Sequence, residues 1–330
     1  MSSLLTEPST LSSLPFSDLL LEPDGFAWYK ASPLDRKRNA LVDEALSEAQ
    51  ALREHLVSND IGMDERVPFG DRILRIMRQY TVRGDVYVCR DIRVEVMPFD
   101  ELGLPPMLLD SLLKPRIQRG GLVIWFGQAG AGKSTSQFSF VSEYLKKFGG
   151  IAWTVENPAE TMLDGPHVGP NGTVGTCYQT EIKRDSEYPE AIQRLLRAAP
   201  NLIMLGEIRT PQVAAEAVLA GMSGHVVSTT LHGSDVVTGL ERLKNLVRES
   251  GLDASMIADA LTAVVYQSMS MGNFAGVARR VITGSPLIIG GSATETSTRV
   301  TLRKGDYAQL KTEIQRQQNI FDGTSVGGKI

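Results

Sequence analysis

The sequence predicts an α/β protein with two parts, a smaller α+β domain followed by a larger domain with a mostly parallel sheet. Three observations predict this fold class. The 330 residues exceed one ordinary hydrophobic core and fit two domains. Up to residue 98, strand-like and helix-like segments suggest a small α+β unit. From Leu122 onward, short apolar segments alternate with helical ones, which is typical of a parallel α/β sheet.

The composition is that of a globular protein outside the membrane. Hydrophobic residues make up 42% and charged residues 22%, and the net charge is 34 − 38 = −4, so tight nucleic-acid binding has no electrostatic basis. Cys89 and Cys177 lack Cys-x-x-Cys spacing, which argues against a zinc site or a disulfide framework. The first basic residue is Lys30, and no apolar stretch approaches the roughly 20 residues that span a bilayer. We expect a cytoplasmic protein with at most peripheral membrane contact.

The N-terminal part begins with a Ser/Thr/Leu-rich segment at 1–15, which we expect to be a flexible lead-in. The domain itself is expected at 16–98. Its predicted elements are two strands within 16–31 joined at Pro23-Asp24-Gly25, helices at 35–57 and 71–80, and strands at 86–89 and 92–96.

The larger domain is expected at 99–320, with an interdomain hinge at about 112–120 and a disordered tail at 321–330. Its predicted strands are 122–126, 151–155, 202–205, 225–229, 280–289 and 298–303. Its predicted helices are 133–147, 189–198, 211–221, 235–249, 253–268 and 307–318.

The sharpest motif is a glycine-rich loop between the first of these strands and the first of these helices. It fits G-x-x-x-x-G-K-[S/T] and consists of Gly127, Gln128, Ala129, Gly130, Ala131, Gly132, Lys133, Ser134 and Thr135. Glycines let successive backbone N–H groups turn toward phosphate oxygens, and the following helix directs its positive end at them. Lys133 would contact the β and γ phosphates and Ser134 would bind Mg²⁺, so the sequence predicts an ATP and Mg²⁺ site.

Acidic residues follow two of the predicted strands. Glu156 ends one strand and Glu207 comes just after another, and ligand groups of an open α/β sheet lie at such carboxyl ends. Both are candidates for ordering Mg²⁺ or the attacking water, whereas Glu160 is expected on the surface. His232 follows a third strand, where it either senses the γ-phosphate or only packs near a helix start, while His225 is expected to be structural.

Four boxes in this order resemble the type II/type IV secretion and pilus motor ATPase superfamily, whose members include PilT-, GspE- and DotB-like motors. They are the phosphate loop, Glu156-Asn157-Pro158, Gly206-Glu207-Ile208-Arg209, and Gly224-His225 with Thr230-Leu231-His232. The resemblance covers about 98–270 and implies a RecA-like P-loop ATPase domain preceded by a PAS-like N-terminal domain. The four-cysteine motif of GspE and the Ala-Ile-Arg-Asn-Leu motif of retraction ATPases are absent, which favours the DotB-like or conjugation branch.

The resemblance also implies roles for particular residues. Glu156 matches the catalytic glutamate, Glu207 the metal-side acid of an atypical Walker B motif, and Arg209 the arginine beside it. His232 becomes a probable site residue. Further arginine candidates are Arg194 and Arg197, which precede that motif, and Arg90 and Arg93 in the N-terminal domain. Asn157, Thr180 and Thr210 depart from the family pattern, which has Asp, Arg and Asp at these positions.

The resemblance implies a homohexameric motor that hydrolyses ATP at the cytoplasmic face of the inner membrane. Its partners would be inner-membrane or coupling components of a type IV(B) secretion, conjugation or pilus machine, without direct contact to nucleic acid. Three alternatives stay open: a RecA-like nucleic-acid motor, a P-loop kinase, and a nucleotide-gated assembly protein with weak turnover. Which of the two glutamates is the base is also open.

Overall fold

The computed structural model describes residues 10–11, 13–14, 16–31, 35–70, 72–92, 96–274 and 277–323. Contacts divide the chain into two compact units, the second of which comprises Val96–Ala159 and Leu163–Ile330. Most of the predicted lead-in at 1–15, and residues 324–330 of the predicted tail, lie outside the described residues. Phe321 closes the last helix and is followed by a turn at 322–323.

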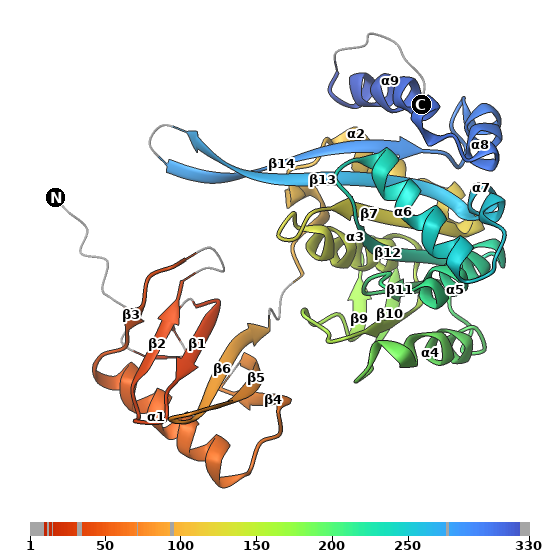
Figure 1. The fold of residues 1–330 in the computed structure, drawn as a ribbon. Helices are drawn as coiled ribbons and strands as arrows, with labels where there is room; N and C mark the ends of the chain where they lie inside the picture. The colour runs from red at the N-terminus through yellow and green to blue at the C-terminus, as the bar shows by residue number, and fades with distance from the viewer. Residues whose placement is uncertain are drawn as a thin grey trace. The chain divides into compact units, whose positions relative to one another are not determined.

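The N-terminal unit is an antiparallel sheet with one helix, α1 (Asp43–Ser58), packed against it (Figure 1). The strand order is β3-β2-β1-β6-β5-β4. The strands are β1 (Asp18–Leu21), β2 (Ala27–Lys30), β3 (Asn39–Ala40), β4 (Asp64–Phe69), β5 (Arg72–Thr81) and β6 (Gly84–Ile92). The helix buries Ala45, Ala49, Leu52 and Leu56, spaced three or four apart, against the apolar side chains of the sheet. The mixed α and β content was predicted, whereas the PAS-like assignment stays a prediction.

One helix predicted in this unit is wrong. Residues 72–80 of the predicted helix lie in strand β5, which pairs with β4 on one side and β6 on the other, and residue 71 lies outside the described residues. Ile73, Leu74, Ile76 and Met77 mimic helical spacing in the sequence, but Leu74 and Ile76 are the fully buried pair, which is the period of a strand. Two flanking strands satisfy its backbone and decide the conformation.

The other N-terminal predictions are closer. The hairpin at Pro23-Asp24-Gly25 forms as β1 and β2. The predicted helix at 35–57 begins later, at Asp43, because residues 39–40 pair with β2. Strand 86–89 lies within β6, while most of the predicted strand at 92–96 lies outside the described residues.

The second unit is built on an eight-stranded sheet of order β14-β13-β7-β12-β11-β8-β10-β9. Its six inner strands run parallel, and β14 and β9 run antiparallel at the edges. The strands are β7 (Gly121–Gly127), β8 (Gly150–Glu156), β9 (Gly165–Val168), β10 (Val174–Glu181), β11 (Leu202–Leu205), β12 (Val226–His232), β13 (Leu261–Phe274) and β14 (Val277–Ile288). The sequence predicts β7, β8, β11, β12 and β14 approximately and misses β9, β10 and β13.

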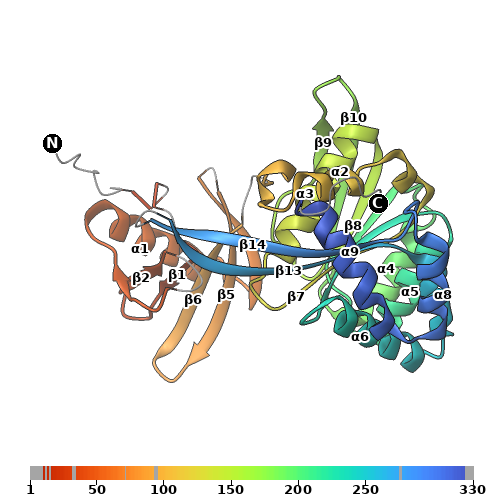
Figure 2. The ribbon, with the colours of Figure 1, turned by 90° about the horizontal axis from the view of Figure 1, so that it is seen from above.

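Helices cover both faces of this sheet (Figures 1 and 2). The α-helices are α2 (Pro106–Leu112), α3 (Lys133–Phe148), α4 (Tyr188–Leu195), α5 (Pro211–Met222), α6 (Val236–Glu249), α7 (Ile257–Ala260), α8 (Glu295–Lys304) and α9 (Lys311–Phe321). The 3-10 turns are η1 (Phe99–Leu102), η2 (Pro115–Arg119), η3 (Asp185–Glu187), η4 (Ala254–Met256) and η5 (Tyr307–Leu310).

Strand β7 separates the two cores of this unit. Leu122, Ile124 and Phe126 pack with α4, α5 and α6 on one face. Val123 and Trp125 pack with α2 and α3 on the other. A strand buried on both faces reads as a continuous apolar run, which is why the sequence identified it. The segment 112–120, predicted to be a hinge, buries Leu112, Leu113 and Ile117 in the second core; its hinge role stays a prediction.

Two secondary-structure predictions near the C-terminus are wrong. Residues 253–268 form η4, a one-turn α7 and then strand β13, because the run from Leu261 pairs in parallel with β7. Residues 298–303, whose apolar positions alternate, belong to helix α8, in which Thr298 and Leu302 share the buried face four residues apart. The predicted helix at 307–318 is present as η5 and α9.

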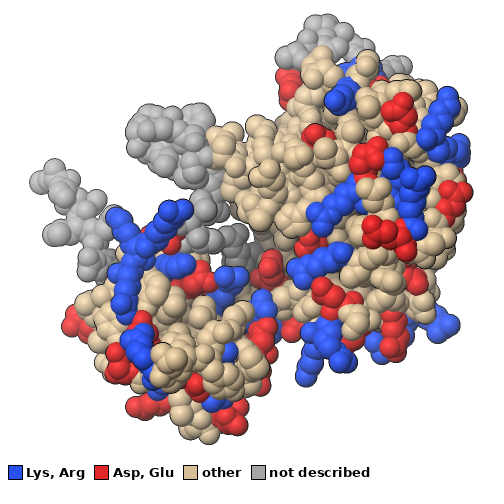
Figure 3. Space-filling view, viewed as in Figure 1, with Lys and Arg blue, Asp and Glu red and all other residues tan. Residues whose placement is uncertain are grey.

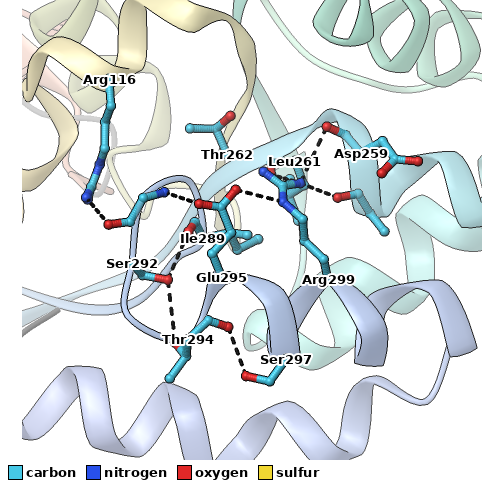
Figure 4. A network of polar contacts seen from close by, with 12 residues as sticks. Arg116, Asp259, Leu261, Thr262, Ile289, Ser292, Thr294, Glu295, Ser297 and Arg299 are labelled. Carbon is cyan, nitrogen blue, oxygen red and sulfur yellow. Dashed lines mark hydrogen bonds and ion pairs between the residues drawn. The ribbon is translucent and has the colours of Figure 1, made fainter.

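A polar network fixes α8 beside the end of β14 (Figure 4). Glu295 accepts hydrogen bonds from the backbone of Gly291 at 2.5 Å and from Arg299 at 2.9 Å, one helical turn further on. Arg299 also donates to the carbonyl oxygen of Ala258 in α7, and Arg116 from η2 donates to the carbonyl of Gly291 at 2.6 Å. These side-chain contacts explain why a segment with strand-like alternation is held as a helix.

The β13–β14 hairpin extends beyond the sheet (Figures 1 and 2). Strand β13 pairs with β7 only from Leu261 to Tyr266 but continues its pairing with β14 to Phe274. The residue after Tyr266, Gln267, therefore lies where β7 gives way to the glycine-rich loop.

Among the described residues, none of the helices combines the length and apolar character that crossing a bilayer requires.

We predict that Gly239→Ala destabilises the second unit. A Cβ at this position of α6 would overlap the ring of Phe126, the penultimate residue of β7. Overpacking of this kind costs about 1–3 kcal/mol, measured as a loss in the free energy of unfolding by urea denaturation. Asn245→Ala, at an exposed position of the same helix, is the control and should be neutral or slightly stabilising. Equal stability of Gly239→Ala and wild type would contradict this close packing.

Candidate active site

The glycine-rich loop joins the end of β7 to the start of α3 at the carboxyl edge of the parallel sheet. Gly130 and Gly132 have φ of 76° and 85°, the left-handed region that glycine adopts without strain. Gly132 is also the N-cap of α3, and no side chain of a described residue caps that helix start. The first-turn N–H groups of α3 therefore face the loop, which forms a concave site suited to phosphate oxygens.

Lys133 lies within this loop and is almost fully buried, at 8% exposure. Its ammonium group donates a hydrogen bond to the carbonyl oxygen of Gln128 at 2.9 Å. This contact places the positive charge near the beginning of the loop, next to Gln128 and Ala129. Ser134 follows in the first turn of α3, where its hydroxyl suits a Mg²⁺ ion shared with the phosphates.

Gln267 supports the loop from β13, a role that sequence reasoning missed. Its amide nitrogen donates to the carbonyl of Ala131 at 2.7 Å, and the side chain is fully buried. A Cβ at Gly127 would come within 2.5 Å of the Gln267 carbonyl oxygen, so the strand and the loop touch backbone to backbone. The sequence could not predict this contact, because the segment that contains Gln267 was predicted to be helical.

Glu156 is the most buried acid at this edge, at 2% exposure. Its Oε1 accepts hydrogen bonds from Thr154 at 2.7 Å and from Gln179 at 2.9 Å. Gln179 is itself fixed, because its own oxygen accepts from the backbone of Leu163 at 2.7 Å. These two hydrogen bonds fix the orientation of the buried carboxylate.

Glu207, Arg209 and His232 form a second acidic group at the same edge. Glu207 contacts Arg209 Nε at 3.0 Å through one carboxylate oxygen and His232 Nε2 at 3.3 Å through the other. Burial lowers the pKa of His232, and the positive charges of Lys133 and Arg242 lower it further, while Glu207 opposes them. The lowered pKa favours the neutral imidazole, which weakens the charge attraction across the 3.3 Å contact with Glu207.

Asp185, the first residue of η3, joins these boxes and was not predicted. One of its oxygens accepts from the side-chain amide of Asn157 at 2.7 Å, and the other lies 3.4 Å from Arg209 Nη1. A continuous chain of contacts therefore runs from Asn157 through Asp185, Arg209 and Glu207 to His232. An Asp at position 157 would face Asp185 with a second negative charge, so the asparagine and this aspartate fit each other.

The other two residues that depart from the family pattern, Thr210 and Thr180, also have local structural explanations. Thr210 is the N-cap of α5 and accepts from the backbone of Val213 at 3.4 Å, a capping role that Asp fills equally well. The backbone of Thr180 donates to Thr154, the same hydroxyl that donates to Glu156. His225 precedes β12 at the opposite edge of the sheet, as expected of a structural residue.

Within the second unit, the arginine candidates Arg194 and Arg197 lie away from the loop. Arg90 forms an ion pair with Asp18 at 2.8 Å in the N-terminal unit, and Arg93 lies outside the described residues. Arg194 approaches Glu190 at 3.9 Å on the exposed side of α4. Arg197 lies in the turn leading to the amino end of β11, so it is at the edge of the sheet opposite the loop.

A cavity of about 410 Å³ adjoins the loop. It is lined by Gln128, Ala129, His232, Gly233, Ser234, Thr238 and Arg242. The loop forms one wall, and the end of β12 with the start of α6 forms the other. Arg242 is a cation at this site that the sequence analysis did not select.

With this geometry in place, comparison with known proteins identifies the family. The family model of Type II/IV secretion system proteins matches residues 45–273. The chain belongs to this family. The predicted resemblance to the superfamily is thereby confirmed.

Individual relatives agree with this assignment. The chain is 27% identical to the type II secretion system protein HxcR of Pseudomonas aeruginosa, over 77% of this chain and 54% of that protein, so it spans about half of that relative's length. It is 27% identical to the type IV pilus retraction ATPase PilT of the same organism, over 86% and 77% of the two chains. The solved ATPase DotB of Legionella pneumophila has the same fold, with a TM-score of 0.68 at 20% identity over 94% of this chain and 85% of that one.

We predict that Asn157→Asp impairs the site and that a compensating change restores it. The new carboxylate would repel Asp185 and disturb Arg209, lowering kcat of ATP hydrolysis about 10-fold, or ~1.4 kcal/mol. Asn157→Asp combined with Asp185→Asn keeps one amide and one carboxylate in contact and should recover most of the loss.

Glu187→Gln provides the matched control for this pair. Glu187 lies in the same 3-10 helix but pairs with Arg184 at 3.0 Å, and its loss should leave kcat unchanged. If the double variant is no better than Asn157→Asp alone, the contact with Asp185 does not position the site.

Proposed function

We propose that this protein is an ATP-hydrolysing motor subunit of a type IV secretion, conjugation or pilus machine. The observation that carries the proposal is the glycine-rich loop with two acidic groups beside it, Glu156 and Glu207, in a chain of the Type II/IV secretion system protein family. Motors of this kind turn the energy of hydrolysis into movement of one domain against another.

The residues present fit Mg²⁺-ATP. Backbone N–H groups of 127–135 would cradle the phosphates, and Lys133 would leave the Gln128 carbonyl to contact the β and γ phosphates. Ser134 and Glu207, the latter partly through water, would hold Mg²⁺, which supplies charge stabilisation to the transferred phosphoryl group.

Glu156 is the better placed of the two glutamates to orient the attacking water. Its carboxylate is buried and anchored through one oxygen by Thr154 and Gln179. Glu207 has both oxygens engaged, by Arg209 and His232, an arrangement suited to a fixed charge beside a metal ion. We therefore assign Glu156 as the general base and Glu207 as the metal-side acid.

The assembly would be a homohexamer at the cytoplasmic face of the inner membrane, bound peripherally to inner-membrane or coupling components. Arg90, Arg93, Arg194 and Arg197 are then candidates for reaching a nucleotide held elsewhere in the ring, and Arg194 and Arg197 lie away from the loop of their own chain. Since Leu112, Leu113 and Ile117 are packed in the second core, we expect bending nearer to Val96, where the second unit begins, than at 112–120. The PAS-like N-terminal domain would move with this bending, and a DotB-like role is the branch we favour.

A nucleic-acid motor is the less supported alternative. On the face of the second unit visible in Figure 3, Lys and Arg side chains are interspersed with Asp and Glu rather than gathered in one basic stripe. Tight binding of a phosphate backbone relies on such a stripe.

We predict that Lys133→Ala abolishes ATP hydrolysis, because the loop loses its charge on the β and γ phosphates. Glu156→Gln should lower kcat by about 10²-fold or more with KM for ATP nearly unchanged, the loss expected for a general base. Glu207→Gln should instead shift the Mg²⁺ concentration that gives half-maximal rate.

Steady-state phosphate release at varied ATP and Mg²⁺ measures all three variants. Lys147→Ala, at the exposed far end of the same helix, is the control for Lys133 and should behave as wild type. Turnover of Lys133→Ala at the wild-type rate would remove the site assignment.

We further predict a hexameric mass by light scattering and an ATPase rate that single-stranded DNA does not change. A monomer whose hydrolysis rises with DNA would favour the nucleic-acid motor. A hexamer that binds ATP with barely measurable turnover would favour the nucleotide-gated assembly protein.

A further inference from the structure

We propose that Arg242 binds the γ-phosphate of the nucleotide held by the loop of the same chain. This inference rests on the proposed function and adds a residue to its site. Arg242 lies on α6, its side chain is exposed, and it lines the cavity beside Gln128 and Ala129.

Arg242 differs from the other arginine at this edge in having no acidic partner. Arg209 is engaged by Glu207 and Asp185. No hydrogen bond or ion pair between the Arg242 guanidinium and another described residue is present. A guanidinium with no partner of its own, at the wall of a cavity, has its five donors available for an anion.

Contacts at both the start and the middle of α6 fix the helix that carries Arg242 beside the cavity. Asp235 and Thr238 form a capping box at the helix start, with Asp235 Oδ1 accepting from the Thr238 backbone at 2.8 Å. Gly239 packs against the Phe126 ring, so the helix lies close to the strand that feeds the loop. Thr238 and Arg242 are four residues apart, share one helix face, and both line the cavity.

The cavity is on the γ-phosphate side of the loop. In loops of this kind the lysine contacts the β and γ phosphates. The Lys133 ammonium lies at the Gln128 carbonyl, and Gln128 is a wall of the cavity. The terminal phosphate of a bound triphosphate therefore extends toward the space that Arg242 faces.

Electrostatics favour an anion in this space. Burial lowers the pKa of His232 most; Lys133, Arg242 and Arg209 lower it further, while Glu207 raises it. Arg209 is balanced by Glu207 and Asp185, whereas no ion pair joins Arg242 to another described residue, so the Arg242 charge favours the γ-phosphate. A planar guanidinium contacts two phosphate oxygens at once, so Arg242 would distinguish ATP from ADP by direct contact.

The experiment measures binding of Mg²⁺-ADP and of a non-hydrolysable Mg²⁺-ATP analogue to the full chain by isothermal titration calorimetry. Arg242→Ala should weaken binding of the ATP analogue about 10-fold or more, the loss of one charge-assisted contact, and change ADP affinity less than about twofold. The affinity of Arg242→Lys for the ATP analogue should lie between those of wild type and Arg242→Ala, because lysine keeps the positive charge but cannot contact two phosphate oxygens at once. Unchanged ADP affinity also reports that the site is folded.

Arg248→Ala is the matched control, an exposed arginine in the last turn of the same helix that does not line the cavity. It should leave both affinities unchanged. Equal weakening of ADP and ATP analogue by Arg242→Ala, or no weakening of either, would overturn the role of Arg242 while leaving the ATPase proposal intact. A wild-type chain that binds neither nucleotide would instead remove the proposed function itself.

Discussion

The burial of β7 between β12 and β13 is the constraint on which the rest of the site depends. Its residues from Leu122 to Phe126 are fully buried and packed on both faces, so the register of the strand and the position of its carboxyl end are fixed. At Gly127 the strand ends and the glycine-rich loop begins. The loop contains backbone turns that need glycine, and α3 follows directly after it. Because the neighbouring strands run parallel to β7, their carboxyl ends deliver Glu156, Glu207 and His232 to the same edge.

Charge at this edge is organised by continuous contacts rather than by isolated pairs. The chain from Asn157 through Asp185, Arg209 and Glu207 to His232 links groups at the carboxyl ends of four strands, β8, β10, β11 and β12. Each exposed pair in it is weak in water, but side chains that share partners restrict one another, and a network is worth more than its separate pairs. Glu156 is more deeply buried and accepts hydrogen bonds from Thr154 and Gln179. The two glutamates thus have distinct surroundings, which is the physical basis for giving them distinct roles.

The sequence predicted the parts of this fold that depend on local pattern. The loop motif, strand β7, the acids after β8 and β11, and helices α3, α5 and α6 all have signals within a few residues. The wrong segments are those whose conformation is decided from outside: β5 and β13 by strands on their flanks, and α8 by Glu295 and Arg299. Asp185 and Gln267 were missed for the same reason, because their contacts join segments far apart in the chain, and Arg242 was missed because only the fold brings α6 beside the loop. The roles assigned to the site residues stay predictions, since geometry places groups without measuring turnover.

The departures from the family pattern have a structural explanation that bears on activity. Thr210 supplies the helix cap that an aspartate would supply, and Asn157 donates to Asp185 where an aspartate would repel it. Thr180 leaves the support of Glu156 in place, because its backbone contacts the Thr154 hydroxyl that donates to the carboxylate. Substitutions that each keep or replace a contact preserve the geometry around Glu156 and Glu207. Because both glutamates and Lys133 are present, we propose a working ATPase rather than a nucleotide-gated assembly protein.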